Sequence, residues 1–364
     1  MLNYFANFRG ELGYTILSRE LFMAMTAERP DDITAVPYDP PGNLPLGVEY
    51  KPQFERTPDV KNGVSLGIQY GNTLYRHAGR KRIGYTMWET TKLPPGWTPC
   101  LNQLDMAWTL SEWGKEVFID NDITVPLGVV PGGVRPEFNP YAEPIDELKK
   151  LKQENFVFLS VFKWEKRKSP DMLLQAFTEE FTEYENASLL LLAYNPFLFS
   201  IESWADKQYQ LLYESGIKKD PRIHFLPWFP THDWLPRIYN SAHAFVLPSR
   251  GEGFGLPYIE AMACGLPTIG TNWSGNTEFM TKDNSWLIDV EYMEGADMPP
   301  FIFPEPGSTW AYPSKDSLKA HMRDIFDNRE KATTKALKAS EYIHNHFEWK
   351  HAAKKAWRYV DDLS

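Results

Sequence analysis

Two glutamates with seven residues between them frame a glycine-containing turn in the last third of the sequence. Glu252 comes first and Glu260 second. The apolar run 244–247 before them has the length of a buried strand, and residues 258–264 are predicted to form a helix. Because N–H groups at the start of a helix favour negative charge, the amides of residues 253–256 are suited to face a phosphate. The spacing therefore predicts an anion site between the two carboxylates.

The segments around this turn predict a parallel crossover. Residues 265–267 end the helix, and residues 268–271 have the pattern of a second short strand. A strand, a loop, a helix and a further strand form such a unit in parallel sheets. The same pattern fits an ordinary crossover whose glycines serve only close packing, so the local sequence alone leaves both interpretations open.

The complete string EGFGLP, followed by EAMACGLP, resembles the glutamate-x7-glutamate signature of retaining glycosyltransferase family 4. The resemblance implies an α/β chain with the GT-B fold, in which two Rossmann-like parallel-sheet domains face each other across a cleft. It also implies a nucleotide-diphosphate sugar as donor. Glu252 would then accept hydrogen bonds from the transferred sugar, and Glu260 from the ribose. The loop residues that would contact the donor are Gly253, Phe254, Gly255 and Leu256.

A basic segment, KWEKRK, follows the apolar run 156–162. The second domain of the resembled family opens in a similar way, with an arginine and a lysine five positions apart that hold the donor diphosphate. The matching positions here are Lys163 and Lys168. Lysine in place of arginine keeps the charge but loses the bidentate fork. Taken by itself, the segment also fits a solvated basic loop.

The first residues of the chain carry a second glycine loop before a helix. Gly10 and Gly13 lie between a short strand, 2–5, and a helical pattern over 14–27. The loop resembles the first loop of the family's N-terminal domain, where backbone groups approach the donor. Gly13 could equally just begin the helix, and the sequence does not decide between these roles.

The sequence departs from the family pattern at a strand predicted over 82–88. Many members carry a histidine at its end, facing the donor sugar, whereas this chain has Glu89 next. Glu89 is therefore a candidate for a polar or electrostatic catalytic role, or a carboxylate that favours a helix N-terminus. His77 lies in a basic run, 76–82, and is expected to be a surface histidine.

Composition sets limits on function. The 364 residues carry a formal net charge of -10, which disfavours a nonspecific nucleic-acid or anionic-membrane surface, although the run 76–82 is locally basic. Two cysteines make neither a disulfide framework nor a metal cluster. We see no signal peptide and no run long enough to span a membrane, so the expectation is a soluble cytoplasmic protein.

Alternation of strand and helix patterns predicts two domains. The family resemblance implies an acceptor-side domain over 1–145, a nucleotide-sugar domain over 146–346, and a final helix over 347–364 that packs back towards the first domain. The charged segment ending at Glu154 is expected as part of an interdomain linker, 136–154. Other expectations are helices over 98–106 and 201–215, a loop near the nucleotide base over 227–233, and a loop over 298–313.

The resulting functional hypothesis is sugar transfer with retention, without a metal or another cofactor, to an acceptor hydroxyl on a glycan or glycolipid. Negative charge grows on the leaving diphosphate, and Lys163, Lys168 and the loop amides are placed to stabilise it. These groups leave no need for a metal ion. Alternatives are a glycosyltransferase acting on nucleic acid or protein, a GT-B phosphorylase or epimerase, and an inactive binding protein.

Overall fold

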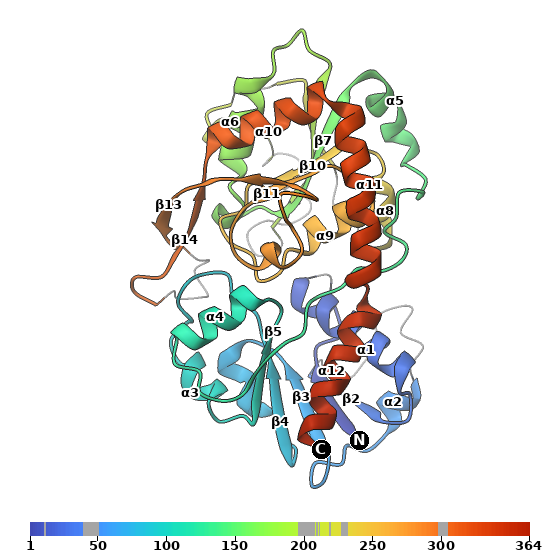
Figure 1. The fold of residues 1–364 in the computed structure, drawn as a ribbon, viewed down its shortest axis with the longest axis vertical. Helices are drawn as coiled ribbons and strands as arrows, with labels where there is room; N and C mark the ends of the chain where they lie inside the picture. Colours follow the sequence, from blue (N-terminus) through green and yellow to red (C-terminus); the bar gives the residue numbers. More distant parts are fainter. Residues whose placement is uncertain are drawn as a thin grey trace. The chain divides into compact units, whose positions relative to one another are not determined.

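The computed structural model describes residues 1–10, 12–38, 51–195, 208, 210, 212–217, 220–226, 232–297 and 305–364. Within it the chain forms two compact units (Figure 1). The first comprises Met1–Arg135, Ile302–Ser308 and His346–Ser364, and the second comprises Pro136–Phe301 and Thr309–Asn345. The first unit is thus built from three separate stretches of chain.

The first unit contains a six-stranded sheet in the order β2-β1-β3-β4-β5-β6, with every pairing parallel. The strands are β1 (Leu2–Ala6), β2 (Ile33–Pro37), β3 (Val64–Ile68), β4 (Lys81–Tyr85), β5 (Met106–Thr109) and β6 (Leu127–Val129). The connecting helices are α1 (Gly13–Glu28), α2 (Lys51–Glu55), the short η1 (Gly71–Arg76), α3 (Trp97–Leu101) and α4 (Glu112–Asp120). Strands β1, β3 and β5 are buried at every residue, as expected when helices cover both faces of a parallel sheet.

The last helix of the chain, α12 (Trp349–Leu363), completes the first unit and packs against α1 (Figure 1). The buried indole of Trp357 donates to the carbonyl of Met25 at 3.1 Å. At the rim, Arg29 forms a two-pronged ion pair with Asp361, with both contacts at 2.8 Å.

The second unit has its own six-stranded parallel sheet, in the order β12-β11-β10-β7-β8-β9. Its strands are β7 (Phe156–Lys163), β8 (Ala187–Tyr194), β9 (Ile223–Phe225), β10 (Ala244–Leu247), β11 (Thr268–Thr271) and β12 (Trp286–Ile288). Its helices are α5 (Asp146–Glu154), α6 (Pro170–Glu180), α8 (Leu235–Tyr239), α9 (Leu256–Ala263), α10 (Lys315–Asp327) and α11 (Arg329–His346), with short turns η2 (Lys166–Lys168), η3 (His232–Trp234) and η4 (Gly275–Glu278).

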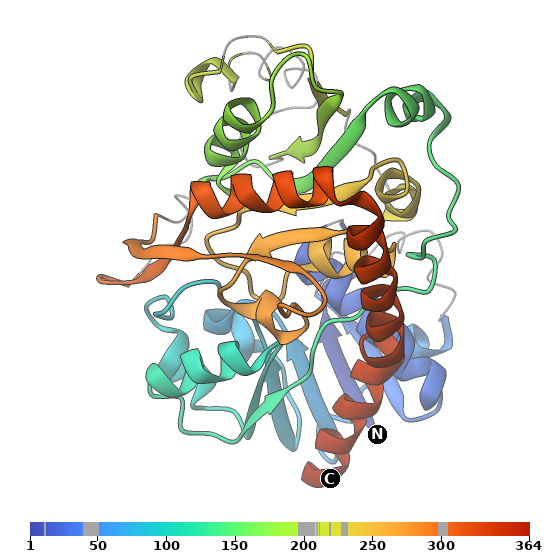
Figure 2. The same cartoon turned by 45° about the horizontal axis from the view of Figure 1, so that its top comes forward.

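An antiparallel hairpin extends from the second unit (Figure 2). It pairs β13 (Val290–Gly295) with β14 (Thr309–Pro313). The sequence prediction of a loop over 298–313 was wrong for the part that forms β14. Tyr292 stacks on Tyr312 across the two strands at a ring-centroid distance of 4.6 Å, a pairing that stabilises antiparallel strands.

Three further sequence predictions differ from the structure. Helix α3 ends at Leu101 instead of continuing to Met106, because β5 begins there and places Met106 in the core. Strand β4 ends at Tyr85, three residues before the predicted end. The segment 146–154 is the helix α5, whose buried Leu148 anchors it to the second unit, so it is not a linker. The helix predicted over 201–215 and the loop over 227–233 lie largely outside the described residues.

Candidate functional site

The glycine turn joins β10 to α9 in the second unit, and its conformation depends on two glycines. Gly255 precedes α9 with a backbone φ of +94°, in the left-handed region that favours glycine. Gly275 approaches so closely that an added Cβ would lie 2.2 Å from the carbonyl oxygen of Gly253. Pro257 stands in the first turn of α9, where its missing N–H is tolerated. The backbone conformation of the turn is therefore tightly constrained at the N-terminus of α9.

Glu252 lies in this turn and is almost fully buried, with 5% of its surface exposed. Its Oε1 lies 2.5 Å from Nζ of Lys168, and its Oε2 lies 3.3 Å from Nη1 of Arg167. Burial by itself would raise the pKa of the Glu252 carboxyl, but Lys168 and Arg167 outweigh burial and lower that pKa below its ordinary value. Glu252 is thus held as a carboxylate between two cations.

Glu165 links the same cations to Lys163. Its Oε1 accepts from Arg167 at 2.7 Å, and its Oε2 lies 2.8 Å from Nζ of Lys163. Burial opposes ionisation of Glu165, but the three nearby cations lower its pKa. The cluster therefore contains three cations, Lys163, Arg167 and Lys168, and two carboxylates, Glu165 and Glu252, which leaves one positive charge in excess.

Glu260 occupies the second turn of α9 and is 4% exposed. The hydroxyl of Tyr239, at the end of α8, donates to its Oε2 at 2.9 Å. Burial and then the charge of Glu260 raise the pKa of Tyr239 well above its usual range, so this hydroxyl stays protonated and serves as a donor. The contact fixes one carboxylate oxygen of Glu260.

The remaining loop residues have structural contacts within the second unit. Phe254 is buried and packs on Phe279, with ring centroids 5.0 Å apart, and Leu256 is the first residue of α9. The backbone N–H of Glu252 donates to the hydroxyl of Ser274 at 2.8 Å. These contacts fix the position of the turn, and its glycines permit the backbone conformation that precedes α9.

The candidates from the N-terminal half belong to the first unit. Gly10 has a φ of +106°, and its carbonyl accepts from Arg19 at 3.1 Å. Gly13 is the first residue of α1, with open space where a Cβ would lie. Glu89 is half-buried beyond the end of β4. Three residues before Glu89 in the chain, the hydroxyl of Thr86 meets the hydroxyl of Tyr14 at 2.8 Å.

His77 is a correction to the sequence analysis, because it is buried instead of lying on the surface. Only 2% of it is exposed, and its ring packs against Phe5, with centroids 5.8 Å apart. An added Cβ on Gly67 would lie 2.4 Å from its Nδ1, so the absence of a side chain at Gly67 makes room for the ring. The neighbouring basic residues suggested a solvated loop, but the ammonium of Lys81 pairs with Asp105 and the guanidinium of Arg82 donates to the carbonyl of Gln103.

Sequence reasoning missed Arg167, Glu165 and Tyr239 as parts of the site. Arg167 stands inside the basic run KWEKRK, so its charge was visible, but the family alignment selected the positions on either side of it. The turn η2 brings Arg167 and Lys168 together towards Glu252. Tyr239 carried no local signal, because its partner Glu260 lies 21 residues farther along the chain.

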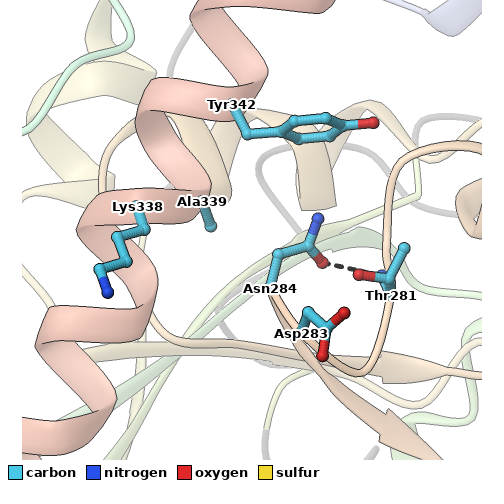
Figure 3. A pocket seen from close by; sticks show the side chains of 6 residues that line it. All are labelled: Thr281, Asp283, Asn284, Lys338, Ala339 and Tyr342. Atoms are coloured by element: carbon cyan, nitrogen blue, oxygen red, sulfur yellow. Dashed lines mark hydrogen bonds between the residues drawn. The ribbon is translucent and has the colours of Figure 1, made fainter.

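The described residues contain a hollow lined by none of the residues of this cluster. Thr281, Asp283 and Asn284 lie on one side of it, and Lys338, Ala339 and Tyr342 of α11 on the other (Figure 3). Asn284 accepts from the backbone N–H of Thr281 at 2.7 Å. None of the predicted site residues lines this hollow.

Two properties of the described residues bear on metal ions and membranes. No group of three or more His, Cys, Asp or Glu side chains is arranged there to hold a metal ion. No helix in that part of the chain has both the length and the apolar character needed to cross a bilayer.

The cluster and the glycine turn lie in a segment of the chain that matches a known sequence family. Residues 153–296 match the family described as glycosyl transferases group 1. This segment contains the cluster, the glycine turn, Tyr239 and Glu260, but not the residues of α11 that line the hollow. The resemblance found in the sequence is thus confirmed for this family, without specifying a subfamily.

Two curated relatives from Escherichia coli match parts of the chain. O-antigen chain mannosyltransferase B is 41% identical over 75 residues, covering 21% of this chain and 19% of the relative. A UDP-Gal:alpha-D-GlcNAc-diphosphoundecaprenol alpha-1,3-galactosyltransferase is 31% identical over 183 residues, covering 48% of this chain and 44% of the relative. The matches therefore span less than half the length of either relative.

A solved structure matches nearly the whole chain. Anabaena HepE in complex with UDP-glucose has a TM-score of 0.69 and 14% sequence identity, covering 99% of both chains. At this identity the likeness concerns the fold alone. With the two parallel six-stranded sheets, it confirms the GT-B fold class expected from the sequence.

Proposed function

We propose that this chain is a retaining glycosyltransferase that moves a sugar from a nucleotide-diphosphate donor to a hydroxyl of a glycan or glycolipid acceptor. The observation that carries the proposal is the buried contact between Lys168 and Glu252, next to the amides that begin α9. It places a cation, a carboxylate and a helix start together, and the family match covers all three.

The cationic side of the cluster suits the leaving group. Departure of a nucleoside diphosphate from the anomeric carbon builds negative charge on the phosphate oxygens. Lys163, Arg167 and Lys168 are fixed cations that would oppose this charge without reorganising, and the α9 amides add the favourable end of the helix dipole. The single excess positive charge of the cluster would offset part of the negative charge of the bound diphosphate.

The two glutamates suit different parts of the donor. An incoming phosphate would compete with Glu252 for Lys168 and Arg167. The carboxylate oxygens of Glu252 would then accept hydrogen bonds from hydroxyls of the transferred sugar. Glu260, whose Oε2 accepts from the hydroxyl of Tyr239, would accept from a ribose hydroxyl. In the first unit, Gly10 and Gly13 would approach the donor, and Glu89 would stand where many members carry a histidine.

The acceptor class rests on the curated relatives. One is named for O-antigen chain mannosyl transfer and the other for transfer to a diphosphoundecaprenol-linked sugar. A carbohydrate or lipid-linked acceptor for this chain follows that pattern. Because fixed cations and amides supply the charge stabilisation, the proposed reaction needs no metal and no other cofactor.

The experiment is a donor screen followed by product analysis. Purified protein is tested for stabilisation by UDP, GDP and their sugars, since a ligand at about a hundred times its Kd adds about 2.7 kcal/mol to stability. Turnover with glycan acceptors is then followed by NMR of the anomeric proton. A product of inverted configuration would contradict the retaining mechanism, and a sugar phosphate formed only with inorganic phosphate would indicate a phosphorylase.

A further inference from the structure

A buried arginine outside the diphosphate cluster connects three segments of the second unit. Arg250 is 3% exposed, and its Nε donates to the hydroxyl of Ser169 at 3.0 Å. Its Nη1 pairs with the carboxylate of Glu294 on β13. The guanidinium also lies 4.9 Å from the ring centroid of Tyr312 on β14, within the range of a cation–π contact.

The backbone of Arg250 joins the same segments. Its N–H donates to the carbonyl of Arg167 at 2.7 Å, and its carbonyl accepts from the N–H of Ala311 at 3.0 Å. One residue therefore holds the turn η2 with its backbone and the start of α6 with its side chain. Lys168 is the last residue of η2 and lies directly before Ser169, the residue that precedes α6.

Ser169 needs this support because of its conformation. It follows Lys168 directly and precedes α6 with a φ of +50°, in the left-handed region that non-glycine residues seldom adopt. Its N–H donates back to Lys166 at 3.0 Å. The hydrogen bond from Arg250 is a side-chain contact that fixes this residue and so the direction in which Lys168 leaves the backbone.

Glu294 makes the arrangement depend on the hairpin. The indole of Trp310 donates to its Oε2 at 3.0 Å, so strand β14 orients the carboxylate that neutralises Arg250. A buried arginine without that carboxylate would be an uncompensated charge and would seek another partner. Because the guanidinium already has Glu294 and Ser169, it is placed to support the cluster and not to bind phosphate itself.

We propose that Arg250, held by Glu294 of the β13–β14 hairpin, is a positioning residue that aims Lys168 and Arg167 at the donor diphosphate. This inference rests on the proposed function. The hairpin thereby becomes part of the donor site without touching the donor, and changes in the hairpin should alter diphosphate affinity.

The test compares Arg250→Gln and Glu294→Gln with a matched control, Arg323→Gln. Arg323 also pairs with glutamates, Glu180 and Glu185, and lies over a ring, that of Phe181. It holds the C-terminal end of the 11-residue helix α6, whereas Arg250 holds the N-terminal end. All three variants should lower the melting temperature, so stability alone does not distinguish the two arginines.

The deciding measurements are calorimetric Kd values for UDP and GDP, at a temperature where each variant is folded. Arg250→Gln should weaken binding by about tenfold or more, because small displacements of a fixed group are costly. Glu294→Gln should weaken it by about threefold, since a neutral acceptor replaces a charged one. Arg323→Gln should leave the Kd unchanged. Equal Kd values for Arg250→Gln and wild type, or equal losses in Arg250→Gln and Arg323→Gln, would overturn the inference.

A second readout does not depend on the nucleotide. If wild type binds neither UDP nor GDP, the donor proposal fails, and hydrogen exchange of residues 163–169 then decides the positioning role. Exchange there should accelerate in Arg250→Gln and in Glu294→Gln, but not in Arg323→Gln. Unchanged exchange in Arg250→Gln would overturn the inference whatever the nucleotide result.

Discussion

The ammonium of Lys168 lies 2.5 Å from the carboxylate of Glu252, although the two residues are 84 positions apart in the chain. The turn η2 supplies the lysine and the glycine turn before α9 supplies the glutamate. Both side chains are less than a tenth exposed, so their interaction is weakly screened by solvent. A bound diphosphate would have to share Lys168 with Glu252.

Replacing Lys168 with alanine should therefore reduce turnover by roughly tenfold to a thousandfold, the range seen when one electrostatic donor to a developing charge is lost. Lys166→Ala is the matched control, because Lys166 lies in the same turn but pairs with Asp297 at the surface. Steady-state kinetics and UDP or GDP affinity measure both variants. Near-normal turnover and affinity in Lys168→Ala would remove the phosphate role.

Changing each signature glutamate to glutamine should separate binding from catalysis. Glu260→Gln should mainly raise the donor KM, because a ribose contact is equal in the ground and transition states. Glu252→Gln should mainly lower kcat, because contacts strengthened in the transition state act on turnover. Calorimetry with nucleoside diphosphate alone should show weaker binding for Glu260→Gln than for Glu252→Gln. The opposite order would reverse the assigned roles.

Activity should survive a strong chelator. The charge stabilisation proposed here comes from Lys163, Arg167, Lys168 and the α9 amides, and none of these depends on a metal ion. Turnover is measured in EDTA after dialysis, with magnesium and manganese added back separately. Loss of activity in EDTA, followed by recovery on adding either ion, would refute metal independence.

Burial of His77 should make the first unit less stable as the pH falls. Burial lowers the pKa of His77 from 6.5 to about 4, so below pH 6.5 the unfolded chain binds a proton that the folded chain excludes. The stability lost between pH 6.5 and 4 from this residue is at most about 3 kcal/mol. Urea unfolding at several pH values should show a flatter profile for His77→Phe than for wild type. Parallel profiles would show that His77 titrates normally.

Features with a local cause could be predicted from the sequence. The glycine turn and α9 follow from a left-handed Gly255 and a proline in the first helical turn, and α6 likewise begins with a proline, Pro170, at a position where proline is tolerated. The buried run of β7 was visible as a continuous apolar segment. Each of these signals lies within a dozen residues of the element that it predicts.

Features that depend on distant partners could not be predicted. Arg250 occurs in a loop, where an arginine usually faces solvent, and only β13 and β14 reveal its partners. The hairpin itself was hidden because its strands are separated by a proline-rich stretch. His77 was misplaced because its basic neighbours indicate solvent, whereas its burial depends on the space beside Gly67.

The first unit gathers three stretches of one chain, so no single continuous fragment corresponds to it. A fragment ending at Arg135 would lack α12, and the surface of α1 that receives Trp357 would face water. It would also lack Ser308, whose hydroxyl meets that of Thr90 at 2.7 Å. One protease cut after Arg135 would not release either half, because the backbone still passes between the units around residues 305–308 and after Asn345. The order in which the chain leaves a ribosome therefore matters: the first unit cannot be completed until residues 346–364 have been synthesised.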